Sequence, residues 1–160
     1  MAKDVRLKLD RIDLELLKLL QEDATLAVAE LASQVHLSAT PCWRRIQRLR
    51  EAGVIRKQVM LLDAAKLNLG VTVFVSIKTS QHSPEWTERF LRGVEAIAEV
   101  VEFYRMSGDV DYLLRVVVAD IKGYDAVYKQ LIQVADLADV SSSFSMEQLK
   151  YTTALPIVPS

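Results

Sequence analysis

Residues 37–53 read LSATPCWRRIQRLREAG, and this stretch predicts one short helix around which the fold is organised. Ser38 is expected to be the N-cap, with Pro41 in the first turn, where its missing N–H would have no partner within the helix. Thr40 is an alternative N-cap. Gly53 is expected to end the helix.

One face of this helix is expected to be buried, because Cys42, Ile46 and Leu49 recur with the spacing of a 3.6-residue helix. The other faces carry mainly arginine, with glutamine, threonine and tryptophan. Such charge usually marks a solvated helix face, yet Arg, Gln and Thr near a helix start also contact base edges and phosphates in a major groove. The residues predicted to bind double-stranded DNA are Ser38, Thr40, Trp43, Arg44, Arg45, Gln47 and Arg48.

Two helices are predicted before this one. Residues 9–22 place leucine and isoleucine on one stripe, with Asp10 as N-cap and Asp13 in the capping-box position. Residues 25–35 repeat the same period over two to three turns, and the short link that follows is typical of a helix-turn-helix. His36 stands where such a turn usually has glycine, and we expect it to adopt a positive φ rather than to bind a ligand.

The pattern becomes strand-like after Gly53. Residues 54–62 are β-branched and apolar, and residues 63–69 form a connector with room for one helical turn. The remaining residues predict strand 71–79, helix 84–97, strand 100–106, a turn at 108–111, strand 112–119, helix 123–134 and strand 140–149.

This β-α-β-β-α-β order is typical of a ferredoxin-like domain, in which two helices cover one face of a sheet. We therefore expect an α+β protein with a winged-helix-like helix-turn-helix domain at 1–58, a linker strand or hinge at 59–70 and a ferredoxin-like domain at 71–160. The second sheet face would be open and apolar, so a second copy of the chain is expected to cover it.

Composition limits the function classes. The 160 residues are 51% hydrophobic and 26% charged, which is ordinary for a soluble globular protein. The net charge of −1 hides a split, because residues 1–58 hold 11 basic and 8 acidic residues and the remainder holds 9 and 13. This distribution allows a local basic face. There is no apolar run of membrane-spanning length and no signal peptide, so we expect a cytoplasmic protein without a membrane partner.

Cofactor and enzyme chemistry are not expected. One cysteine and two histidines exclude a disulfide framework and a conventional zinc cluster, and Cys42 is expected to pack in the core. His36 and His82 lie in separate turns and no glycine-rich phosphate loop occurs, so no catalytic residue and no metal ligand is predicted. A ligand-binding or protein-docking module without specific DNA recognition remains the alternative to a DNA-binding regulator.

Four segments together resemble one protein family: LDRIDLELLKLLQED, VAELASQVHLSATPCWRRIQRLREAGVI, VTVFVSIK and MSGDVDYLLRVVVAD. In combination they are similar to the Lrp/AsnC (feast/famine) family of bacterial transcription regulators. The resemblance implies dimerisation through the C-terminal sheets, assembly toward tetramers and octamers, and an amino acid effector bound between those domains. His36 and Trp43 depart from the family pattern, and they are expected to alter the DNA sequence read rather than the fold.

The turn at residues 107–112 has two interpretations. As a pattern it is a hairpin, in which Gly108 supplies a positive φ and the aspartates cap local N–H groups. The resemblance implies instead an effector-binding loop whose backbone N–H groups and carboxylate receive an amino acid. The residues predicted on that basis are Ser107, Gly108, Asp109, Asp111 and Tyr112, with Ser142 expected to face the same cleft.

Overall fold

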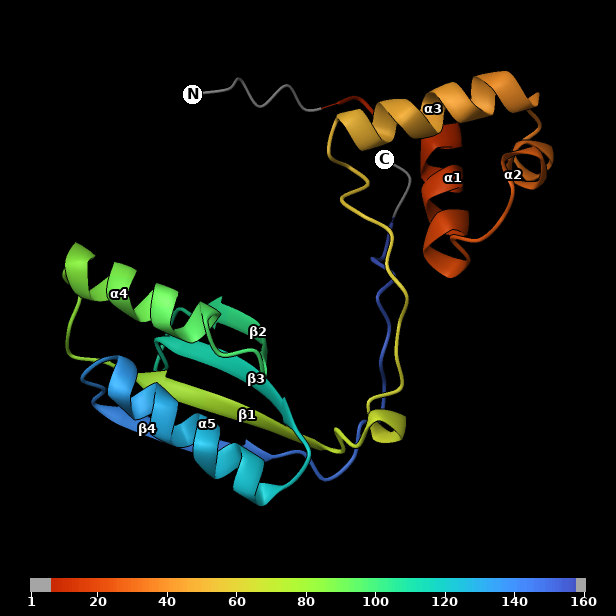
Figure 1. Cartoon of the computed structure of the whole chain (residues 1–160). Coiled ribbons are helices and arrows are strands. Elements are labelled where there is room, and N and C mark those ends of the chain that lie inside the picture. The colour runs from red at the N-terminus through yellow and green to blue at the C-terminus, as the bar shows by residue number, and fades with distance from the viewer. Residues whose placement is uncertain (1–6, 158–160) are drawn as a thin grey trace. The chain divides into compact units, whose positions relative to one another are not determined.

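The computed structural model describes residues 7–157, which divide into two compact units (Figure 1). The described part of the first unit is 7–61 together with 150–157, and the second unit is 62–149. The C-terminal segment thus groups with the N-terminal helices. The Gln21 side chain joins the two segments, because its amide accepts the Leu155 N–H at 2.7 Å and donates to the Leu155 carbonyl at 3.3 Å.

The first unit contains three helices, α1 (Arg11–Glu22), α2 (Val28–Gln34) and α3 (Ala39–Glu51). Its core confirms the predicted apolar stripes, because Leu16, Leu31, Cys42 and Ile46 are buried together. Leu49 is also fully buried. Burial raises the pKa of the Cys42 thiol, as expected for a packing residue.

The turn between α2 and α3 confirms the role predicted for His36, which adopts a left-handed φ of 55°. The His36 N–H donates to the Ser33 carbonyl at 3.3 Å. Helix α2 begins at Val28 rather than at residue 25. The Glu30 carboxylate caps this start by accepting the Ala27 N–H at 2.8 Å. Gly53 follows α3 with a φ of 71°, which satisfies the predicted helix stop.

The prediction of a strand over residues 54–62 is wrong. In the described chain no strand lies between α3 and the second unit, because an extended segment needs a partner ladder and this one finds none within its own chain. Met60 and Leu62 are instead 88% and 73% exposed. The connector does contain one turn of 3₁₀ helix, η1 (Ala65–Leu67), as predicted.

The second unit confirms the ferredoxin-like order. Its elements are β1 (Val71–Lys78), α4 (Pro84–Glu95), β2 (Val100–Arg105), β3 (Tyr112–Val118), α5 (Ile121–Val134) and β4 (Asp139–Phe144). The strands pair antiparallel in the order β2-β3-β1-β4. Strand β4 ends at Phe144 rather than at residue 149, because Phe144 already pairs with Val73 near the start of β1.

Helices α4 and α5 cover one face of the sheet (Figure 1), where alternate residues of β1 and β3 form the core with both helices. The two helices approach each other at Gly93. A Cβ placed on Gly93 would lie 2.2 Å from Cγ1 of Val134, so only glycine permits this contact.

The opposite sheet face is mixed rather than uniformly apolar, which corrects the sequence expectation. Phe74 is 40% exposed there and lies opposite Arg115 in the ladder. The Arg115 guanidinium donates to the Glu102 carboxylate at 2.5 Å and holds the pKa of that carboxyl below its usual value. This face combines apolar side chains with an internally neutralised ion pair.

Candidate DNA-binding and effector sites

Helix α3 presents a polar stripe directly opposite its buried stripe. Thr40, Arg44 and Gln47 are spaced by four and three residues, which places them on one helix face. Thr40 and Arg44 are exposed and Gln47 is half-buried. The apolar face is occupied by the core, so Thr40 and Arg44 lie on the solvent side of the helix and Gln47 lies at its edge.

Two predicted DNA-binding residues flank this polar stripe. Trp43 is 51% exposed, which is unusual for so large an apolar side chain. Ser38 occupies the N-cap position of α3 but its side chain makes no capping hydrogen bond, so its exposed hydroxyl can contact another molecule.

Arg45 and Arg48 contact acidic residues of α1. An Arg45 Nη1 donates to Asp13 Oδ1 at 2.9 Å, and Arg48 Nη2 donates to Asp13 Oδ2 at 2.5 Å. The Asp13 side chain is fully buried, whereas those of Arg45 and Arg48 are partly exposed. The DNA contacts predicted for both arginines stay a prediction, and DNA would have to compete with these ion pairs.

Asp10 completes this group, which we call the aspartate–arginine cluster: Asp10, Asp13, Arg45 and Arg48. Asp10 Oδ2 accepts from Arg45 at 2.6 Å, and Asp10 and Asp13 form the predicted reciprocal capping box. The hydrogen bond from the Asp13 N–H, followed by that from Arg45, lowers the pKa of Asp10. The Asp10 and Asp13 carboxylates raise the pKa of Arg45.

Sequence reasoning identified Asp13 only as a capping residue. One sequence feature could have predicted its ion pairs. Asp13 lies next to the apolar stripe of α1, where a buried carboxylate needs a partner on a neighbouring helix. Arg50 was also left out of the predicted set. It is exposed in the last turn of α3 and forms no ion pair with any residue of the described chain.

The predicted effector turn has the expected hairpin geometry, with a φ of 112° at Gly108. Asp109 pairs with Lys78 at 2.9 Å, and the Asp111 carboxylate accepts the Thr79 N–H at 2.8 Å. Both carboxylates therefore tie the turn to the end of β1. Within the described chain, the backbone N–H groups of residues 107–110 donate to no backbone acceptor.

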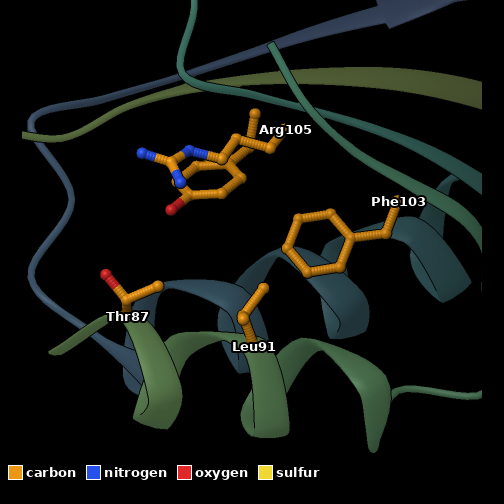
Figure 2. Close-up of a pocket in the computed structure, with 5 residues that line it drawn as sticks. Thr87, Leu91, Phe103 and Arg105 are labelled. Atoms are coloured by element: carbon orange, nitrogen blue, oxygen red, sulfur yellow. The ribbon is translucent and has the colours of Figure 1, made fainter. Parts of the chain in front are cut away.

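Tyr112 follows this turn and lines a pocket of about 180 Å³ in the second unit. The other lining residues are Thr87 and Leu91 of α4 and Phe103 and Arg105 of β2. Figure 2 shows the Thr87 hydroxyl and the Arg105 guanidinium at one end, with Leu91 and Phe103 forming the apolar end. The lining of this pocket thus combines a guanidinium and hydroxyl groups with apolar side chains.

The pocket includes residues that sequence reasoning did not assign to a site. Leu91 is 38% exposed and lines the pocket. Arg105 forms no ion pair with any residue between 7 and 157. Its position two residues before the predicted turn was the one signal for Arg105 in the sequence.

Ser142 is not brought together with the turn. It lies in β4, which is separated from β3 by β1, and its hydroxyl is hydrogen-bonded to the Tyr124 hydroxyl of α5. Ser107 and Gly108 are both exposed. The six predicted effector residues thus form one group of five around the turn and one separate serine.

No group of three or more potential ligands among residues 7–157 could hold a metal ion. None of the described helices is both long enough and apolar enough to cross a membrane.

Two protein-family models match the chain. Residues 72–155 match the Lrp/AsnC ligand binding domain, and residues 9–56 match a winged helix-turn-helix DNA-binding domain. Among curated relatives, the DNA-binding transcriptional activator DecR of Escherichia coli (strain K12) is 54% identical, with 93% of this chain and 99% of the relative covered. The glutamate uptake regulatory protein of Zymomonas mobilis is 51% identical, with 94% and 92% covered.

Two solved structures of transcriptional regulators are similar to this chain over most of its length. An AsnC family transcriptional regulator from Agrobacterium tumefaciens is 64% identical with a TM-score of 0.89, covering 92% of this chain and 97% of that one. A transcriptional regulator from Neisseria meningitidis in complex with L-Met is 33% identical with a TM-score of 0.88, covering 93% and 97%. With a DNA-binding helix-turn-helix unit and an amino-acid-binding unit in one chain, this protein belongs to the Lrp/AsnC family of transcriptional regulators.

Proposed function

We propose that this regulator binds double-stranded DNA through the polar stripe of α3, with Arg44 as its main base or phosphate contact. The observation that carries this proposal is the exposure of Thr40 and Arg44, with the half-buried Gln47 on the same helix face, opposite a fully packed apolar face. Arg reads guanine in two hydrogen bonds and Gln reads adenine, so the stripe has the chemistry for direct readout. Ser38 and the α3 N-terminus suit a phosphate, and Trp43 suits a sugar or base edge.

The effector is inferred to be an amino acid with an apolar side chain, bound at the turn and its adjoining pocket. The Arg105 guanidinium and the N–H groups of residues 107–110 would receive its carboxylate. Leu91 and Phe103 would contact its side chain. The Neisseria relative bound to L-Met supports this chemical class. Asp109 and Asp111 would help bind the ammonium group, although both already hold the turn.

The working form is proposed to be at least a dimer, with further assembly to tetramers or octamers. Phe74 and its neighbours leave one face of the sheet uncovered in the single chain, and a second copy is the simplest cover. A two-fold dimer presents two copies of α3, so its DNA sites would be imperfect palindromes with half-sites about one helical turn apart. The cytoplasm is the proposed location of this assembly.

The alternative of a protein-docking module without specific DNA recognition makes a different prediction about salt. Protein docking lacks the steep salt dependence that counterion release imposes on DNA binding. A salt titration of the binding constant therefore separates the two functions.

Replacing Arg44 with glutamine should weaken binding to a DNA site selected from a random pool by about 1–3 kcal/mol, roughly 5- to 150-fold, because a charged contact is lost. Fluorescence anisotropy over a series of salt concentrations measures this. Arg92→Gln is the matched control, since Arg92 lies on α4 and pairs only with Glu88 among the described residues. Equal losses in the two variants would contradict a direct role for Arg44.

Replacing Arg105 with glutamine should lower the affinity for L-methionine about tenfold or more, because the carboxylate loses a charged hydrogen-bond partner. Calorimetry measures the affinity, and a melt of the free protein checks that the fold is intact. Arg89→Gln is the control, since Arg89 is exposed on α4 and does not line the pocket. If Arg105→Gln binds methionine as tightly as the unchanged protein, the pocket is not the effector site.

Light scattering at micromolar concentration should return a mass of at least twice the 18.0 kDa of one chain. The uncovered sheet face is the reason, because burying its apolar side chains favours association. A mass of 18.0 kDa would refute the proposed dimer.

A further inference from the structure

Asp13 is the one charged side chain that is buried among residues 7–157. Its two oxygens accept from three groups: the Asp10 N–H at 3.1 Å, Arg45 at 2.9 Å and Arg48 at 2.5 Å. Two of these donors come from α3, more than thirty residues along the chain. The carboxylate therefore joins α1 to the helix that carries the DNA-binding stripe.

Capping alone does not account for this arrangement. The capping box needs only the bond between Asp13 and the Asp10 N–H, together with its reciprocal bond at 2.9 Å. A capping carboxylate can also be left exposed to water. The two guanidinium groups on Asp13 are an additional feature that requires its own explanation.

Stability alone is also an insufficient explanation. In a buried ion pair, the cost of removing both charges from water offsets most of their attraction. Replacing such a pair with apolar residues is therefore often neutral or stabilising. Removing one partner is costly, however, because the other charge is left buried without compensation. Asp13 consequently disfavours any state in which Arg45 and Arg48 leave it.

The cluster halves the free positive charge of α3. Its two aspartates and two arginines sum to zero, whereas Arg44 and Arg50 form no ion pair with a residue of the described chain. Nonspecific DNA binding depends on the number of phosphates that free cations neutralise. Arg48 is nevertheless 45% exposed, so without Asp13 its guanidinium could swing toward a phosphate.

We propose that Asp13 is a specificity-determining residue that holds Arg45 and Arg48 on the protein and so weakens nonspecific DNA binding. The Thr40–Arg44–Gln47 stripe then contributes a larger share of the total affinity, and this share depends on the base sequence. Specificity is the difference between two binding free energies, so lowering the nonspecific one raises it. Asp13 also acts as a positioning residue for α3 through the same contacts.

The test is Asp13→Asn, which keeps the size and one carbonyl oxygen but removes the charge. For random-sequence duplex DNA, the variant should bind more tightly, and its slope of log affinity against log salt should steepen by about one to two. The ratio of specific to nonspecific affinity should fall about tenfold. If Asp13 were only structural, the melting temperature and both affinities would fall together and the slope would stay unchanged.

Asp23→Asn is the matched control, because it makes the same charge change in the same unit. Asp23 accepts hydrogen bonds only from Thr25 among the described residues and pairs with no arginine. The proposal expects this control to leave the nonspecific slope unchanged. A slope change equal to that of Asp13→Asn would mean that net charge alone is responsible, and it would overturn the proposal.

Arg48→Gln keeps the proposal testable even if Asp13→Asn does not fold. Arg48→Gln in the unchanged background should leave the nonspecific slope as it was, because Arg48 is already held by Asp13. A flattening of about one would show that Arg48 contacts phosphate and would overturn the proposal. Where Asp13→Asn does fold, adding Arg48→Gln should return its slope toward the original value, and a failure to do so would also overturn it.

Discussion

The buried carboxylate of Asp13 is the contact on which the DNA-binding unit depends. It lies between α1 and α3, and its charge is compensated only while two arginines of α3 remain beside it. This requirement fixes the rotation of α3 about its own axis. Cys42, Ile46 and Leu49 of α3 lie in the core, and the Thr40–Arg44–Gln47 stripe lies on the opposite side of the helix.

A similar constraint organises the second unit around its turn. Asp111 and Asp109 bond to Thr79 and Lys78, so the β2–β3 hairpin is tied to the end of β1. The backbone N–H groups of residues 107–110 in this turn donate to no backbone acceptor within the described chain. Tyr112 and Arg105, on either side of that turn, line the same pocket. Rigid carboxylate contacts thus hold both candidate sites in place.

Much of this structure could be predicted from the sequence because it depends on local chemistry. The apolar periods of α1 and α3, the positive φ of His36 and the hairpin at Gly108 follow from neighbouring residues alone. The prediction of a strand at 54–62 was wrong because a strand needs a pairing partner elsewhere in the chain. Strand β4 is shorter than predicted because its partner β1 begins at Val71.

The unpredicted parts of the sites are contacts between residues far apart in the sequence. No periodicity reveals that Arg45 and Arg48 meet Asp13, or that the Ser142 hydroxyl is engaged with Tyr124. The pocket was missed for the same reason, because it combines one helix with two strands and depends on Leu91 facing outward. Sequence pattern identified which helix and which turn are candidates, and tertiary contacts decide which of their side chains are free.

The most direct test of this account is a crystal structure of the protein bound to a DNA duplex selected from a random pool. The account predicts that Arg44 contacts a base or a phosphate while Arg45 and Arg48 keep their hydrogen bonds to Asp13. A complex in which both arginines have left Asp13 and lie on phosphates would contradict it.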